Sequence, residues 1–180
     1  MRDERWLTAA GFALTAAGAL LAAVGTTVIW MSTGLRRDIR GLLDLEFRGL
    51  DLMEGIVALV VAAMTIVGLV LVRRLRGSAR VGIAVSLVAC GVVLIALPVW
   101  VAVRAEDRAV EEIAQVVAGS AGITIDEATR RVRTEPDLAV RADSSGVWLS
   151  IGGGVLVTLG GVSTLLWARR DPSDRLAEEP

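Results

Sequence analysis

The chain has 180 residues and a net charge of −1, and 54% of its residues are hydrophobic. Soluble domains are usually about 45–50% apolar, so the composition favours an integral membrane protein. The balanced charge argues against a nucleic-acid partner and against a polybasic lipid-binding role. All 19 basic residues are arginine and histidine is absent, which excludes imidazole metal ligands, histidine proton shuttles and lysine Schiff bases.

Four long apolar stretches predict four membrane-spanning helices, because a hydrocarbon core of about 30 Å needs roughly 20 helical residues. The expected spans cover residues 7–30, 55–72, 81–103 and 147–167. The first is longer than the apolar region of a signal peptide, which has about 7–15 residues, so we expect it to be retained. The predicted fold is all-α, a four-helix transmembrane bundle with a small helical external cap, formed by residues 1–180 as a single domain.

Small residues line one face of the first span and one face of the fourth. In the first span they recur at steps of three and four residues, at Gly11, Thr15, Gly18, Ala22 and Gly25. The similar face of the fourth span carries Ser150, Gly154, Thr158 and Gly161. Such faces let helix backbones approach closely in lipid. We therefore expect packing within the bundle, with homo-oligomerisation through the first span as the alternative.

The first external segment, residues 32–51, has apolar residues at a spacing close to that of a helix. They are Leu35, Ile39, Leu42, Leu43 and Phe47. A short amphipathic helix in this segment would either lie on the membrane surface or pack over the ends of the bundle, and the sequence leaves both open. Just beyond it Glu54 precedes the second span, where we expect an interfacial carboxylate rather than a functional group inside the membrane.

The second external segment, residues 104–146, is expected to form the cap. The third span can continue as a helix into solvent until the Gly-Ser-Ala-Gly sequence at residues 119–122 interrupts it. Thr124 and Glu127 have the spacing of a capping box, which predicts a short helix as far as about residue 133. Pro136 then imposes an extended or turn geometry on the residue before it.

Each of the five tryptophans lies near an end of an apolar stretch. Indole rings are enriched at the membrane–water interface, because the ring is apolar and its N–H is polar. We therefore predict interface anchors at Trp6, Trp30, Trp100, Trp148 and Trp167.

The distribution of arginine predicts the orientation of the spans. The link at residues 73–80 has no acidic residue and carries Arg73, Arg74, Arg76 and Arg80. Together with residues 1–5 and 168–180, this link has roughly twice the arginine density of the external segments. The positive-inside rule therefore places both termini of this multi-pass protein on the cytoplasmic side of the cell membrane.

The sequence contains no recognisable catalytic or phosphate-binding motif, and Cys90 lies in mid-span among small residues, where packing is the expected role. We expect no catalytic, cofactor-binding or metal-binding residues. The expected function is a non-enzymatic accessory or assembly subunit of a larger membrane complex, in contact with the lipid bilayer and with a protein partner or further copies of the chain. The alternative is a small oligomeric transporter or channel protomer, although the spans lack the charged mid-span residues usual in transporters.

The layout also resembles a known family. The resembling features are Trp30 just past the first span, the Gly-Leu-Asp-Leu stretch at residues 49–52, the arginine-rich link at 73–80 followed by Gly82, and Trp148 at the start of the fourth span. The chain is thereby similar to a family of small four-span membrane proteins of high-GC Gram-positive bacteria, associated with tryptophan-biosynthesis operons. Residues 106–145 contribute nothing to this resemblance. Because that family has no established activity, the resemblance implies a membrane protein and no particular chemistry.

Overall fold

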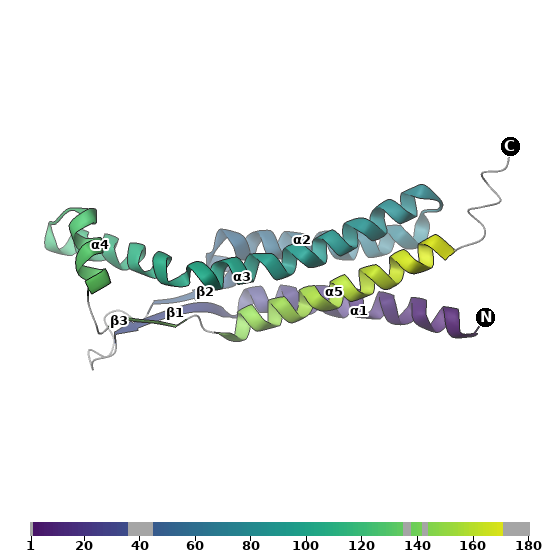
Figure 1. Ribbon diagram of the computed structural model, residues 1–180, viewed down its shortest axis with the longest axis horizontal. Coiled ribbons are helices and arrows are strands. Elements are labelled where there is room, and N and C mark those ends of the chain that lie inside the picture. The colour runs from purple at the N-terminus through teal and green to yellow at the C-terminus, as the bar shows by residue number, and fades with distance from the viewer. Residues whose placement is uncertain (1, 36–44, 135–137, 142–143, 171–180) are drawn as a thin grey trace.

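The computed structural model describes residues 2–35, 45–134, 138–141 and 144–170. Four long helices lie side by side along one axis (Figure 1). They are α1 (Arg2–Thr27), α2 (Met53–Arg74), α3 (Ser78–Ala121) and α5 (Ser144–Arg170). Helix α5 packs against α1 and α3, and α2 packs against the same two helices from the other side. Each long helix therefore has two neighbours, as in a closed four-helix bundle.

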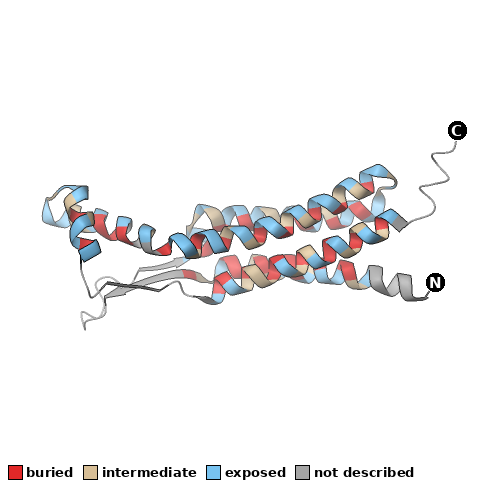
Figure 2. Cartoon of the chain, viewed as in Figure 1, coloured by how far each residue is buried: buried red, intermediate tan, exposed pale blue. Residues whose placement is uncertain are grey.

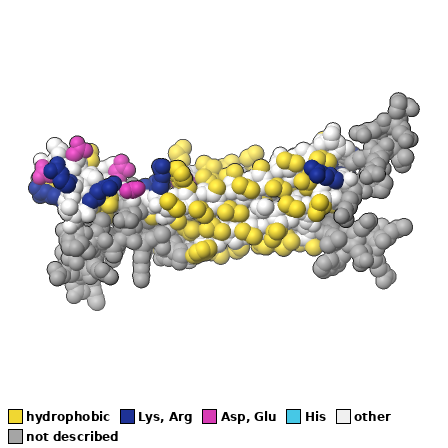
Figure 3. Space-filling view, in the orientation of Figure 1, with side chains coloured by type: hydrophobic (Ala, Val, Ile, Leu, Met, Phe, Trp, Pro, Cys, Tyr) yellow, Lys and Arg dark blue, Asp and Glu magenta, His cyan; other side chains and the backbone are white. Residues whose placement is uncertain are grey.

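Each of these helices contains a segment long and apolar enough to cross a membrane. The four segments are Ala9–Thr27, Met53–Arg74, Ser78–Ala105 and Ser145–Arg169. Apolar side chains form a continuous band around the middle of the visible face, and arginines border the band (Figure 3). The buried residues lie on the helix sides that face one another (Figure 2). The predicted all-α transmembrane bundle is thereby confirmed.

Helix α3 is much longer than a membrane span and carries the cap. It has 44 residues, so about 24 Å of helix projects beyond the apolar segment at a rise of about 1.5 Å per residue. It ends at Gly122, whose left-handed backbone (φ 65°) closes the helix while its N–H bonds to the Ala118 carbonyl. Helix α4 (Ile125–Thr134) then folds back onto α3. The cap lies at the opposite end of the bundle from the start of α1 and the end of α5 (Figure 1).

A three-stranded antiparallel sheet completes the cap, and sequence analysis did not predict it. The strands are β1 (Ile29–Leu35), β2 (Leu45–Arg48) and β3 (Leu138–Arg141), in the order β2-β1-β3. In β1, Thr33 pairs with Leu45 on one side and with Val140 on the other. The first span therefore ends at Thr27 rather than at residue 30. The helix expected within residues 32–51 is wrong for its described parts, and residues 36–44 lie outside the described chain.

Candidate functional site

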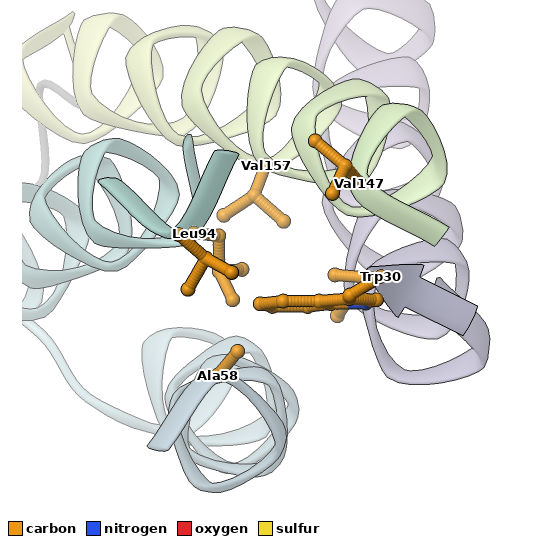
Figure 4. Packing of buried hydrophobic residues seen from close by; sticks show 8 residues of the cluster. Trp30, Ala58, Leu94, Val147 and Val157 are labelled. Carbon is orange, nitrogen blue, oxygen red and sulfur yellow. The ribbon is translucent and has the colours of Figure 1, made fainter. Parts of the chain in front are cut away.

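Trp30 fills the cap end of the bundle core. Its side chain is 0% exposed, and the ring lies between Ala58 of α2, Leu94 of α3, and Val147 of α5 (Figure 4). The indole N–H donates a 2.8 Å hydrogen bond to the Gly25 carbonyl. Helix α1 ends at Thr27, about one turn before the end of the apolar run, and Trp30 lies in β1 at the end of the bundle. The structure thus corrects the prediction for Trp30, whose ring is a core element and is not exposed to headgroups.

The other predicted anchors lie differently from Trp30. Trp100 and Trp148 are 50% and 66% exposed, and both belong to the half of the bundle that carries the cap. The Arg104 guanidinium carbon lies 4.0 Å from the centre of the Trp100 ring, a cation–π distance. Trp167 lies at the opposite end on α5, and Trp6 belongs to α1 with a side chain outside the described set.

An ion pair joins the start of α2 to the projecting part of α3. The two terminal guanidinium nitrogens of Arg108 donate hydrogen bonds to the two carboxylate oxygens of Glu54, one of them at 3.1 Å. The side chains retain 17% exposure at Glu54 and 33% at Arg108. The hydrogen bonds that Arg108 donates to Glu54 raise the pKa of Arg108 above its ordinary value. The sequence places Glu54 at the interface but does not identify its partner.

The cap has a small core of its own. Val110, Ile113 and Ala114 of α3 pack against Ala128 and Val132 of α4. At the periphery Arg133 pairs with Asp107 at 3.2 Å, and Arg131 pairs with Glu127 at 2.6 Å. The predicted N-cap of α4 is present, since Thr124 Oγ1 accepts the Glu127 N–H at 3.4 Å. The cap is therefore held to the bundle by a continuous helix, by apolar contacts and by the Glu54–Arg108 pair.

The predicted small-residue face of α1 packs against α5 of the same chain. A Cβ atom placed on Gly18 would lie 2.5 Å from the Gly153 carbonyl oxygen, and one on Gly11 would lie 2.9 Å from the Ser163 hydroxyl. Thr15 and Ala22 on the same face are fully buried. Gly25 lies against Ser150.

The two predicted glycines of α5 face a different helix. A Cβ on Gly154 would meet the Gly91 carbonyl oxygen of α3 at 2.9 Å, and one on Gly161 would meet the Val88 nitrogen at 3.0 Å. Helix α5 therefore has two small-residue faces, one against α1 and one against α3. The sequence pattern grouped Ser150 with Gly154, whereas the structure separates them.

Arginine and aromatic side chains gather at the end opposite the cap. The Arg73 guanidinium carbon lies 4.4 Å from the centre of the Phe12 ring, and that of Arg80 lies 4.6 Å from the centre of the Trp167 ring. The two rings meet edge to face at 6.2 Å. Each of the four long helices contributes one member of this group. The predicted topology arginines Arg73 and Arg80 thus also hold the helix ends together.

Within the described residues, no group of three or more Asp, Glu, Cys or His side chains is placed to hold a metal ion. Among the described residues, charged side chains contact neighbouring long helices at two places, the Glu54–Arg108 ion pair at the cap end and the arginine cluster at the other end. Four apolar helices, a packed interior and a cap on one side define a four-span membrane protein with an extramembrane domain.

A comparison with known protein families identifies the family of the chain. The chain belongs to the tryptophan-associated transmembrane protein family, whose profile matches residues 12–176. The match includes residues 106–145, which contain none of the resembling sequence features. No curated protein and no solved structure matches the chain.

Proposed function

We propose that this protein is a non-enzymatic accessory or assembly subunit that stabilises or regulates a larger complex in the membrane. The observation that carries the proposal is the interior of the bundle, which is filled by direct helix contacts. Helix α5 meets α1 and α3 at glycine positions where a single added carbon would touch the facing backbone. The Trp30 ring occupies the cap end of the same interior. A bundle packed in this way leaves its protein-binding capacity on its outer surfaces.

The polar groups inside the bundle support the same proposal. The hydroxyls of Thr15, Thr65 and Thr164 bond to the carbonyls one turn earlier in their own helices, at 2.8–2.9 Å. Their hydrogen-bonding capacity is used within the helix, so they are poor ligands for a transported solute. The buried Ser150 hydroxyl is an exception, with no partner among the described residues, but it faces the close contact with Gly25.

The competing function is a channel or transporter formed by several copies of the chain. Since the interior of one copy is filled, a conducting path would have to run between copies. We place the cap outside the cell and both termini in the cytoplasm, which follows from the arginine distribution and gives the cap access to extracellular portions of a partner.

Affinity purification in mild detergent tests the proposal. We expect one or more membrane proteins to be recovered in fixed proportion to this chain, and to be lost when detergent harsh enough to separate subunits is used. The measurement is quantitative mass spectrometry of the eluate together with its size in native gels. Recovery of a homo-oligomer alone would contradict the accessory role.

Proteoliposomes containing the purified chain alone test the alternative. We expect no solute or ion flux above that of empty vesicles. Flux that is abolished by Glu54→Gln and retained in a control variant of the exposed Glu127 would establish the transporter in place of the accessory subunit. The control removes the same charge from a residue whose pair lies on α4.

A further inference from the structure

The end of the bundle opposite the cap is strongly basic among its described side chains. Arg73 and Arg74 end α2, and Arg76 lies in the link that follows it. Arg80 lies in the first turn of α3, and Arg169 lies in the last turn of α5. The sequence contains no acidic residue from 55 to 105 or from 144 to 170. The net charge of −1, which taken alone argues against a polybasic lipid-binding role, conceals an uneven distribution. Residues 1–5, 73–80 and 168–180 hold nine arginines and six acidic residues, whereas the other fourteen acidic residues fall within residues 32–54 and 106–143.

The arginines of the two ends differ in their partners. In the cap, Arg108, Arg131 and Arg133 each pair with a carboxylate, and the exposed Arg130 has no ion pair among the described residues. At the opposite end Arg74, Arg76 and Arg169 are exposed, and within the described chain none of these three forms an ion pair. As far as the described side chains go, their positive charges are therefore available to an external anion.

The position of these arginines relative to the membrane indicates which anions can reach them. Phe12 and Trp167 belong to membrane-crossing segments, and they hold Arg73 and Arg80 by cation–π contacts. Directly before the cluster, Val70 and Leu71 are 50% and 42% exposed and end the apolar band. The arginines therefore lie where hydrocarbon gives way to headgroups, as their position beside the band in Figure 3 illustrates.

We propose that this end of the protein binds the headgroups of anionic phospholipids, with Arg74 and Arg76 as the principal contacts. A guanidinium can donate two parallel hydrogen bonds to one phosphate. Basic residues beside membrane helices attract anionic lipids at the surface, and the attraction falls off within a Debye length. Arg73 and Arg80, fixed by Phe12 and Trp167, would hold the loop that presents these contacts. This binding would be distinct from any protein partner and from the role of arginine in setting topology.

Lipid retention by the purified protein tests the proposal. The protein is incorporated into nanodiscs from equal amounts of phosphatidylglycerol and phosphatidylcholine, transferred to mild detergent, and its bound lipids are counted by native mass spectrometry. We expect the wild-type chain to retain phosphatidylglycerol preferentially. Arg74→Gln with Arg76→Gln should lower the ratio of retained phosphatidylglycerol to phosphatidylcholine on the order of tenfold.

Two control variants make the result specific. Arg130→Gln with Arg131→Gln removes the same charge from exposed residues of the cap and should leave the ratio unchanged. Arg74→Lys with Arg76→Lys preserves the charge, and with it insertion and folding, and should keep most of the preference while making it more sensitive to salt. If the glutamine variant does not fold, two other measurements still test the proposal. They are the lipid ratio of the wild-type chain and the fall of this ratio in the lysine variant at high salt.

Three results would overturn the proposal. One is a wild-type chain that retains the two lipids equally. Another is an equal loss of preference in the Arg74/Arg76 and Arg130/Arg131 glutamine variants, which would indicate a nonspecific charge effect. The third is displacement of the retained lipid by glycerol phosphate at comparable concentration, which would indicate a site for a soluble anion.

Discussion

Trp30 shows how one side chain can satisfy both packing and backbone demands. Gly25 lies in the last turn of α1, where its carbonyl accepts only the Val28 N–H at 3.3 Å from the backbone and has no partner four residues ahead. The Trp30 indole supplies a hydrogen bond to that carbonyl and fills the core directly beyond it. Trp30, predicted as a membrane anchor, therefore fills the core of the bundle at the cap end.

Replacement of Trp30 should destabilise the protein much more than replacement of an exposed tryptophan. Trp30→Phe removes the N–H donor and part of the buried ring, and we expect a loss of about 1–3 kcal/mol in the free energy of unfolding. Trp148→Phe is the matched control, because Trp148 is 66% exposed. Thermal unfolding in detergent can be followed with a dye that reacts with the single thiol, Cys90. Equal melting temperatures for the two variants would contradict the core role of Trp30.

The Glu54–Arg108 pair should contribute measurable coupling between α2 and the cap. In a double-mutant cycle with Glu54→Gln and Arg108→Gln, we expect a coupling of about 1–2 kcal/mol, since the pair is bidentate and partly shielded from water. The exposed Glu127–Arg131 pair on α4 provides the comparison, with an expected coupling of about 0.3–0.5 kcal/mol. Chemical denaturation in detergent measures both. A coupling at Glu54–Arg108 no larger than the comparison would show that this contact does not hold the cap.

The sequence located Glu54 but could not identify Arg108 as its partner. The two residues are 54 positions apart, and residues 104–146 contain six arginines. Spacing along a helix selects none of the six. The pairing follows from the continuation of α3 past the membrane, which brings Arg108 beside the first turn of α2.

At the scale of elements, the α1–α5 contact gives the sharpest test. Gly18→Ala adds one carbon that would lie 2.5 Å from the Gly153 carbonyl oxygen, whereas Gly82→Ala adds one that meets nothing within 4 Å. Alanine favours helix over glycine by about 1 kcal/mol, so Gly82→Ala should be neutral or stabilising. Gly18→Ala should lower the melting temperature because α1 and α5 must separate.

The same pair of variants separates the two interpretations of the α1 face. If the face packs within one chain, Gly18→Ala changes stability while the oligomeric state in detergent stays that of the wild type. A shift to smaller oligomers with unchanged monomer stability would instead assign the face to association between copies. Size-exclusion chromatography with light scattering provides the measurement.

Local sequence signals predicted some elements of the cap and not others. Helix α4 was predictable because Thr124 starts it and the preceding Gly122 ends α3, and both signals lie within a few residues of the boundary. The sheet was not predictable, since β1 pairs with β3 more than 100 residues further along the chain. The apolar residues from Leu35 to Phe47 happen to fit a helical spacing, and no local pattern reveals a distant strand partner.

For the whole molecule, the bundle places the start of α1, the end of α5 and the Arg73–Arg80 link at one end and the cap at the other. If the cap lies outside the cell, as we propose from the arginine distribution, a reporter enzyme active only outside the cytoplasm should be active when inserted at Gly119 and silent at Gly77. Gly119 is exposed in the last turn of α3, two residues before the helix ends at Ala121, so an insertion there would disturb only the end of the helix. The reverse pattern of activity would invert the orientation and leave the fold unchanged.

The sequence predicted the overall architecture because only a few kinds of backbone structure can cross a lipid bilayer. Each span must satisfy its backbone internally and present apolar side chains outward, so length and hydropathy suffice to find it. The order of packing around the bundle was not accessible. The two small-residue faces of α5 differ by only a few positions, and Gly153 and Gly154 point to different neighbours.

Helix α3 runs without interruption from Ser78 to Ala121, which makes the cap and one wall of the bundle a single rod of about 66 Å. Pro98, buried in the bundle, has no N–H to bond to the Leu94 carbonyl and marks the weakest point of that rod. From there to the tip is about 35 Å, so a tilt of about 10° at the proline would displace the tip by about 6 Å. A tilt of α3 at Pro98 would therefore move the cap relative to α2 and would strain the Glu54–Arg108 pair that joins them.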